Sequence, residues 1–137
     1  MVATGVEGVT QSTQFTLTIL QNCLQKAITA PTVADQTYLV YDPLVTFSVP
    51  TFTNEDETFC PLTYSLTHTA TGEPSFLTTR VNQRDVDCFT ESNVDSGLYS
   101  VTVSATNPDG VSAEVTYSLT VEVNCAFMVV SFPPVLD

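Results

Sequence analysis

The chain has 137 residues, the length of one ordinary domain with short flanking segments. Fifteen acidic residues against three basic ones give a net charge of −12, which repels phosphate backbones and argues against nucleic acid as a partner. The sequence holds no apolar run of about 18 residues, so we expect no membrane insertion in this segment.

An internal repeat links the two ends of the chain. Residues 3–35 align with residues 105–137 at a constant offset of 102 without a gap, and 11 of the 33 positions are identical. The identical positions include the Asn-Cys pairs at Cys23 and Cys125. This pattern predicts a tandem repeat of about 102 residues.

The repeat also predicts a domain organisation. Residues 1–23 are expected to form the C-terminal hairpin of a preceding repeat, 24–125 a complete unit, and 126–137 the first strand segment of a following repeat. The alternative is an independent protein that carries two additional strands.

Apolar and hydroxylated residues alternate with a period of two along most of residues 24–125, which is typical of half-buried strands. An extended entry is expected over 26–33. The expected strands cover 36–41, 44–50, 61–69, 75–81, 84–89, 97–106 and 112–124. Seven short strands in about 100 residues indicate an all-β fold, a seven-stranded β-sandwich.

The segment 95–101 carries the most specific local motif. Its Asp-Ser-Gly-Leu-Tyr run resembles the tyrosine corner of immunoglobulin-like domains, in which the Tyr hydroxyl bonds back to the preceding backbone. The resemblance implies this role for Asp95, Gly97 and Tyr99. Val101 stands where antibody domains have a cysteine, which excludes an antibody-type inter-sheet disulfide.

Residues 99–121 are similar to the last hairpin of cadherin-like and immunoglobulin-like tandem-repeat domains, which occur in large microbial and protist surface proteins. With the segments that begin at Pro31 and Asp42, the resemblance spans most of 28–124. It implies an immunoglobulin/cadherin-like sandwich. The Asp-x-Asn-Asp-Asn linker that binds calcium in true cadherins is absent.

The four cysteines are Cys23, Cys60, Cys88 and Cys125. None has the C-x-x-C spacing of a zinc or redox site, so we expect disulfides. Alternating strand directions place the first two at one pole and the last two at the other, which predicts the pairs Cys23–Cys60 and Cys88–Cys125. Because Cys23 and Cys125 are equivalent in the repeat, either the repeats differ or one pair is wrong. Four free thiols are the further alternative.

Acidic loop residues offer the main candidate ligand set. Glu55, Asp56 and Glu57 lie in one expected loop and Asp109 in another at the same pole, so their oxygens are candidates for binding Ca²⁺. We favour the simpler interpretation, a solvated acidic loop that keeps the protein soluble, and therefore expect no metal and no cofactor. His68 is the only histidine and no catalytic constellation is evident, so we do not expect an enzyme.

We therefore expect a structural repeat unit of an extracellular fibre, surface-layer or stalk protein on the cell surface. Its partners would be neighbouring copies, joined end to end or by strand addition, and its Thr/Ser-rich surface would carry O-linked glycans. The alternative is a carbohydrate- or protein-binding adhesin module whose pole loops present Phe52 and Phe59, with Ca²⁺ as a cofactor.

Overall fold

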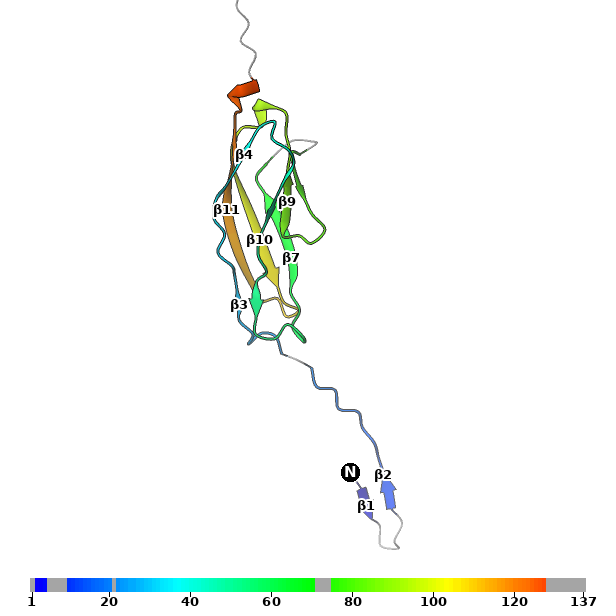
Figure 1. Cartoon of the computed structure of the whole chain (residues 1–137). Coiled ribbons are helices and arrows are strands. Elements are labelled where there is room, and N and C mark those ends of the chain that lie inside the picture. The colour runs from blue at the N-terminus through cyan, green and yellow to red at the C-terminus, as the bar shows by residue number, and fades with distance from the viewer. Residues whose placement is uncertain (1, 5–9, 21, 71–74, 128–137) are drawn as a thin grey trace, which may run out of the picture.

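The computed structural model describes residues 2–4, 10–20, 22–70 and 75–127. The strands between residues 28 and 122 run along the long axis of a sandwich (Figure 1). The strands are β1 (Val2–Thr4), β2 (Thr10–Ser12), β3 (Ile28–Thr29), β4 (Gln36–Leu39), β5 (Val45–Ser48), β6 (Thr53–Asn54), β7 (Thr63–His68), β8 (Leu77–Thr79), β9 (Asp85–Cys88), β10 (Gly97–Thr106) and β11 (Ser112–Glu122). Two short 3-10 helices are η1 (Asn93–Asp95) and η2 (Cys125–Phe127). The all-β sandwich prediction is confirmed.

One sheet has the strand order β4-β11-β10-β7. Its central pair, β10 and β11, is antiparallel over ten residue pairs, from Gly97 opposite Val121 to Thr106 opposite Ser112. The edge strand β4 instead runs parallel to β11, with Gln36 opposite Leu119. The strand β4, which comes early in the chain, is therefore hydrogen-bonded directly to β11, the last strand of the sandwich.

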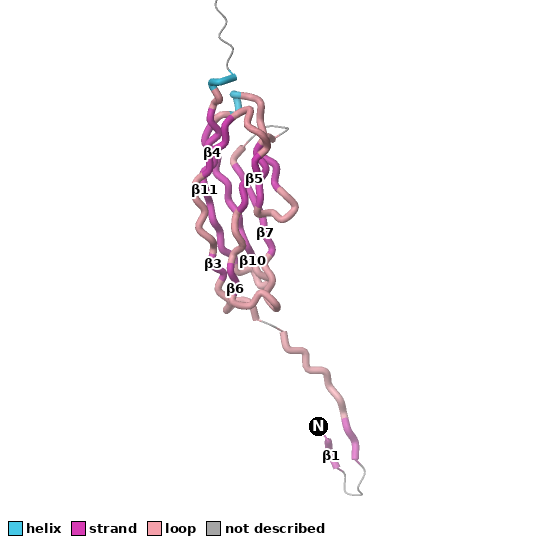
Figure 2. The backbone as a smooth tube through the Cα atoms, in the orientation of Figure 1, coloured by secondary structure: helices cyan, strands magenta, loops and turns pink. Residues whose placement is uncertain are grey.

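The facing sheet has the order β5-β9-β8, and a short antiparallel pair, β3 with β6, lies near the end of the sandwich (Figure 2). All seven predicted segments contain a strand, and the prediction of 97–106 matches β10 residue for residue. The structure adds β3, inside the predicted extended entry, and β6. The described part of the sandwich therefore contains two short strands, β3 and β6, in addition to the seven predicted ones.

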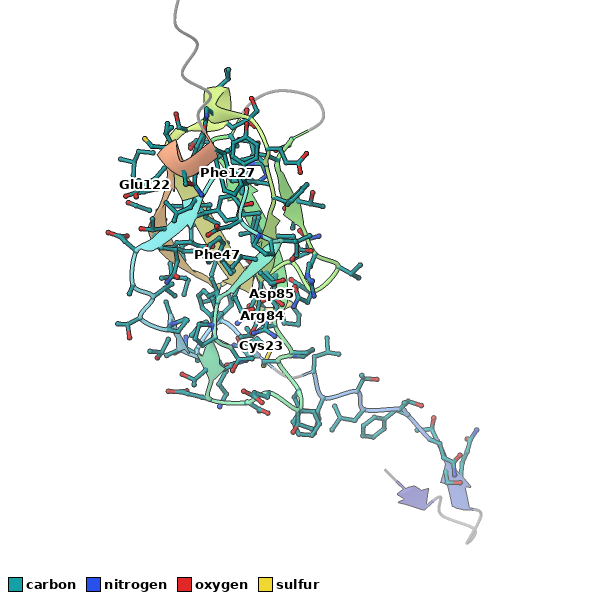
Figure 3. All side chains as sticks on the ribbon, turned by 45° about the horizontal axis from the view of Figure 1, so that its top comes forward. Cys23, Phe47, Arg84, Asp85, Glu122 and Phe127 are labelled. Carbon is teal, nitrogen blue, oxygen red and sulfur yellow. A yellow bond between two sulfur atoms is a disulfide. The ribbon has the colours of Figure 1, made fainter. Side chains whose placement is uncertain are left out.

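The core lies between the two sheets and follows from the alternation along each strand. Val101, Val103 and Ala105 of β10 are fully buried, while the hydroxylated residues between them face outward. Phe47 of β5 points between the sheets (Figure 3). Each fully buried Val, Leu or Phe contributes roughly 1.5–3 kcal/mol relative to an exposed one.

The N-terminal strand pair repeats the register of the central one. In β1 and β2, Val2, Ala3 and Thr4 lie opposite Ser12, Gln11 and Thr10. Adding 102 to each number gives the last three pairs of β10 and β11, which are Ser104 with Glu114, Ala105 with Ala113, and Thr106 with Ser112. The two antiparallel pairs therefore share one register as well as similar sequences.

The segment 126–137, predicted as the first strand segment of a following repeat, is described only over its first two residues. Its first residues belong to η2, which ends at Phe127, and 128–137 lie outside the described residues. The ring of Phe127 packs against Tyr41, with 5.2 Å between the ring centroids. None of the helices in the described part of the chain is long and apolar enough to cross a membrane.

Candidate functional site

One end of the sandwich contains the disulfide, and we call it the disulfide pole; it comprises Cys23, Cys60 and the turn 107–110. Cys23 and Cys60 form a disulfide with 5.8 Å between their Cα atoms, and both side chains are buried. The prediction of this pair is confirmed. Figure 3 shows Cys23 where the N-terminal segment joins the sandwich, with Phe127 toward the other end.

The turn between β10 and β11 holds the backbone of Cys23 on both sides. The Cys23 N–H donates to Oδ2 of Asp109 at 2.6 Å, and Nδ2 of Asn107 donates to the Cys23 carbonyl at 2.8 Å. Asn107 is 4% exposed, and its Oδ1 accepts the N–H groups of Asp109 and Val111. Gly110 closes the turn at a φ of +87°, where a side chain would be strained.

Two of the four acidic candidates, Asp56 and Asp109, have backbone partners at this pole. Asp109 is occupied by Cys23, and Oδ1 of Asp56 accepts the Phe59 N–H at 3.2 Å. Nδ2 of Asn54 donates to the Cys60 carbonyl, which fixes the loop that holds Glu55 and Glu57. Within the described ranges, no three acidic, His or Cys side chains gather into a metal-binding group. The contacts assign Asp56 and Asp109 a role in shaping the pole.

The predicted Cys88–Cys125 pair is wrong, because both residues are free thiols in the described chain. Cys88 takes an inward-facing position of β9, opposite Val45 and Leu77, so its side chain enters the core instead of reaching the pole. Cys125 is exposed in η2. Burial, with a smaller contribution from the charge of Asp95, raises the pKa of Cys88 to about 12.

The end opposite the disulfide pole contains the residues of the tyrosine corner. The Tyr99 hydroxyl donates to the backbone carbonyl of Asp95 at 2.7 Å. Gly97 lies under the same ring, since a Cβ built there would be 3.5 Å from the Tyr99 hydroxyl. The Asp95 carboxylate accepts a hydrogen bond from the Thr90 hydroxyl, which ties η1 to the end of β9.

The two aromatic candidates for ligand binding have different environments. Phe52 is only 1% exposed and packs edge-on against Tyr64, so it belongs to the core. Phe59 is 65% exposed beside the disulfide. The prediction of exposed loop aromatics is therefore correct for Phe59 and wrong for Phe52.

The sequence matches no model of a known protein family, and no curated protein is significantly similar to it.

Proposed function

We propose that the chain is a structural repeat unit of an extracellular fibre, surface-layer or stalk protein that assembles end to end. One observation carries the proposal. Phe15, Leu17 and Ile19 are 78%, 73% and 85% exposed. Their equivalents at the offset of 102, Tyr117, Leu119 and Val121, are 3%, 0% and 2% exposed in β11.

Phe15, Leu17 and Ile19 form an exposed apolar stripe. Its exposure to water costs free energy, which burial against a neighbouring sandwich would recover. Three apolar side chains at alternating positions have the spacing of the inward face of a strand, although they follow the end of β2, and nothing in the described chain covers them. Burying each would stabilise an assembly by roughly 1.5–3 kcal/mol. The shared register of the two antiparallel strand pairs supports the same role, that of the last hairpin of an adjacent unit.

The strand order supports a mechanical role. The chain enters the sandwich near Cys23 at one end and leaves β11 toward the other (Figure 1). Because β4 and β11 are parallel neighbours, tension between the two ends would load their hydrogen bonds in shear, so that several must break together. The disulfide at Cys23 would pass that tension directly into the loop that holds Cys60.

Surface chemistry supports an extracellular location. The Cys23–Cys60 disulfide is of the kind that persists in oxidising compartments. On the outer face of the larger sheet, hydroxyls lie opposite one another in rows; Thr102 lies between Thr67 and Thr116. Such a hydroxyl-rich surface suits O-linked glycans.

A graft tests whether the N-terminal segment is a final strand. We would replace residues 112–122 of the full chain with the sequence of residues 10–20, which puts Phe, Leu and Ile at 117, 119 and 121. The variant should unfold cooperatively in urea. As a matched control, the sequence of 11–21 at the same place puts Thr at 117 and 119, and should not fold.

A truncation tests assembly itself. A chain ending at Gly110 lacks β11, so the N-terminal segment of each copy should complete the sandwich of the next and give head-to-tail polymers in sedimentation and electron microscopy. The same truncation with Phe15, Leu17 and Ile19 all changed to Ser should not polymerise. Equal behaviour of the two truncated chains, or an unfolded graft, would contradict the proposal.

Native-source material tests the location. Intact mass before and after reduction should show one disulfide, and deglycosylation should remove hexose-type increments from Thr/Ser peptides. Unmodified chains with four thiols would contradict a surface location.

A further inference from the structure

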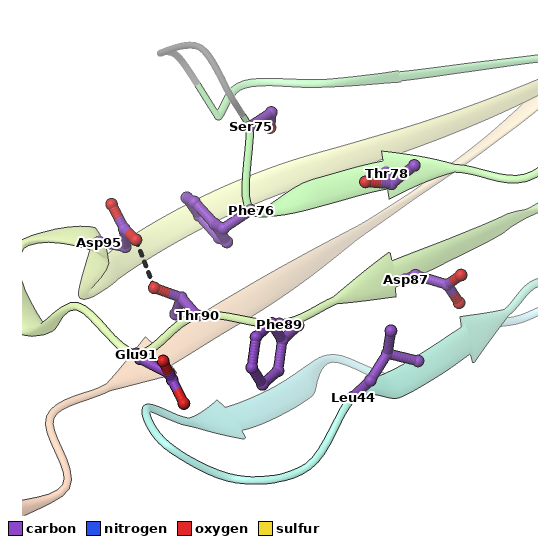
Figure 4. Close-up of a pocket in the computed structure, with 9 residues that line it drawn as sticks. All are labelled: Leu44, Ser75, Phe76, Thr78, Asp87, Phe89, Thr90, Glu91 and Asp95. Atoms are coloured by element: carbon purple, nitrogen blue, oxygen red, sulfur yellow. Dashed lines mark hydrogen bonds between the residues drawn. The ribbon is translucent and has the colours of Figure 1, made fainter.

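The outer face of the smaller sheet contains a hollow of about 460 Å³, between the three strands and the segment that follows β9 (Figure 4). Val45, Cys88 and Leu77 lie opposite one another across β5, β9 and β8, and the last two point fully inward. Leu44, Phe89 and Phe76 precede or follow them by one residue and line the hollow on the outside.

These three side chains give the hollow an apolar floor that remains open to solvent. Leu44 is 55% exposed and Phe89 is 46% exposed. Phe76 packs edge-on against Tyr99 with 5.0 Å between ring centroids, and its carbonyl accepts the Phe89 N–H at 3.1 Å. The two Phe residues are thus fixed in relation to each other, one partly covered and one available to a ligand.

The charged groups around this floor are three carboxylates, which accept hydrogen bonds, and the hydroxyls of Ser75, Thr78 and Thr90 also line it. Glu91 and Asp95 border one end of the hollow, and Asp87 borders the other (Figure 4). Asp87 accepts from the Thr46 hydroxyl at 2.6 Å and from Nε of Arg80 at 2.8 Å, and these two partners lower its pKa. Asp95 already accepts from Thr90 and keeps further lone pairs.

We propose that this hollow binds a neutral glycan, with one face of a sugar ring on Phe89 and with sugar hydroxyls donating to Glu91 and Asp95. A sugar ring has an apolar C–H face and a rim of hydroxyl donors, which complements an aromatic floor with acceptors beside it. The net charge of −12 opposes an anionic ligand. Arg80 already forms an ion pair with Asp87. The hollow therefore attracts a bulky cation less strongly than three unpaired carboxylates would.

The hollow differs from the loop site expected from the sequence, since Phe59 lies at the disulfide pole and does not border it. It also does not depend on the exposed stripe at residues 15–19. Glycan binding and end-to-end assembly can therefore fail separately.

The test is titration of the full ¹⁵N-labelled chain with short oligosaccharides of glucose, mannose and galactose, followed by amide chemical shifts. At least one series should shift the amides of Phe89 and Glu91 with a dissociation constant on the order of 1 mM. Phe89→Ala should weaken binding at least about tenfold, equivalent to roughly 1.4 kcal/mol. Phe59→Ala is the matched control and should bind like the parent chain.

Glu91→Gln keeps the size of the side chain and should weaken sugar binding severalfold without affecting the urea midpoint. Oligolysine is the competing probe. Shifts at the hollow with oligolysine but none with sugars would overturn the ligand class. Loss of sugar binding in Phe59→Ala with retention in Phe89→Ala would move the site to the pole, and no shift with any oligosaccharide at about 10 mM would overturn the site altogether.

Discussion

The backbone N–H of Cys23 donates to the carboxylate of Asp109 at 2.6 Å, although 86 residues separate them in the sequence. Through this bond the turn between the last two strands holds the point at which the chain enters the sandwich. The disulfide to Cys60 holds the same residue through its side chain. Entry segment, final hairpin and the Cys60 loop therefore form one mechanical unit.

Replacing Asp109 should loosen that unit. Asp109→Ala removes a charged acceptor from a partly buried N–H, so we expect a loss of about 1.5–3 kcal/mol of unfolding free energy, measured by urea denaturation. Asp109→Asn retains an acceptor oxygen and should lose less. Equal midpoints for the Ala variant and the parent chain would show that the bond contributes nothing to stability.

The disulfide should account for a larger part of the stability. It closes a loop across a sequence separation of 37, so its reduction or Cys60→Ser should cost about 4 kcal/mol by chain entropy. Cys125→Ser removes an exposed thiol and should leave the urea midpoint within about 0.5 kcal/mol of the parent.

The two remaining thiols should differ sharply in reactivity. Cys125 is exposed, whereas Cys88 is 0% exposed and its raised pKa keeps it protonated. Alkylation of the unreduced native protein near neutral pH should label Cys125 quickly and Cys88 only after denaturation. Rapid labelling of Cys88 in the native state would contradict its placement in the core.

Two tyrosines should respond in opposite directions to loss of their hydroxyls. Tyr99→Phe removes the hydrogen bond to Asp95 and should destabilise the fold by about 1 kcal/mol. The buried hydroxyl of Tyr117 has no hydrogen-bond partner among the described residues, so Tyr117→Phe should stabilise by about 1 kcal/mol. The equivalent position in the repeat is already a phenylalanine, Phe15. Thermal melts of both variants measure the contrast, and changes of the same sign would refute it.

Stability should fall at alkaline pH. Burial raises the pKa of Cys88 from 9.0, and that of Tyr117 from 10.0, to about 12 in each case. The folded state therefore binds these protons more tightly than the unfolded state does. Their contribution is complete below about pH 9 and is lost as pH rises toward 12. Urea midpoints across this range should drop less for Cys88→Ala/Tyr117→Phe than for the parent; parallel curves would assign the loss to other groups.

The sequence by itself predicted the seven longer strand segments, the all-β sandwich and the Cys23–Cys60 pair. The period of two along 97–106 fixes which side chains face inward, because successive residues of a strand point to opposite faces. Placing Cys23 and Cys60 at the same end of the sandwich was enough to predict their disulfide. Both lie outside the longer strands, in segments that can approach each other.

Only the tertiary structure decided which neighbours each side chain meets. Cys88 lies near a strand end, yet its inward orientation across from Leu77 separates it from Cys125. In the sequence Asp109 is only a turn residue, and the fold brings Cys23 into hydrogen-bonding distance of it. Phe52 was predicted as an exposed loop aromatic, but in the fold it packs against Tyr64. Period and turn signals are local, whereas these contacts depend on register and on which sheet lies opposite. The hollow beside Phe89 arises in the same way, from three strands whose adjacency no local pattern specifies.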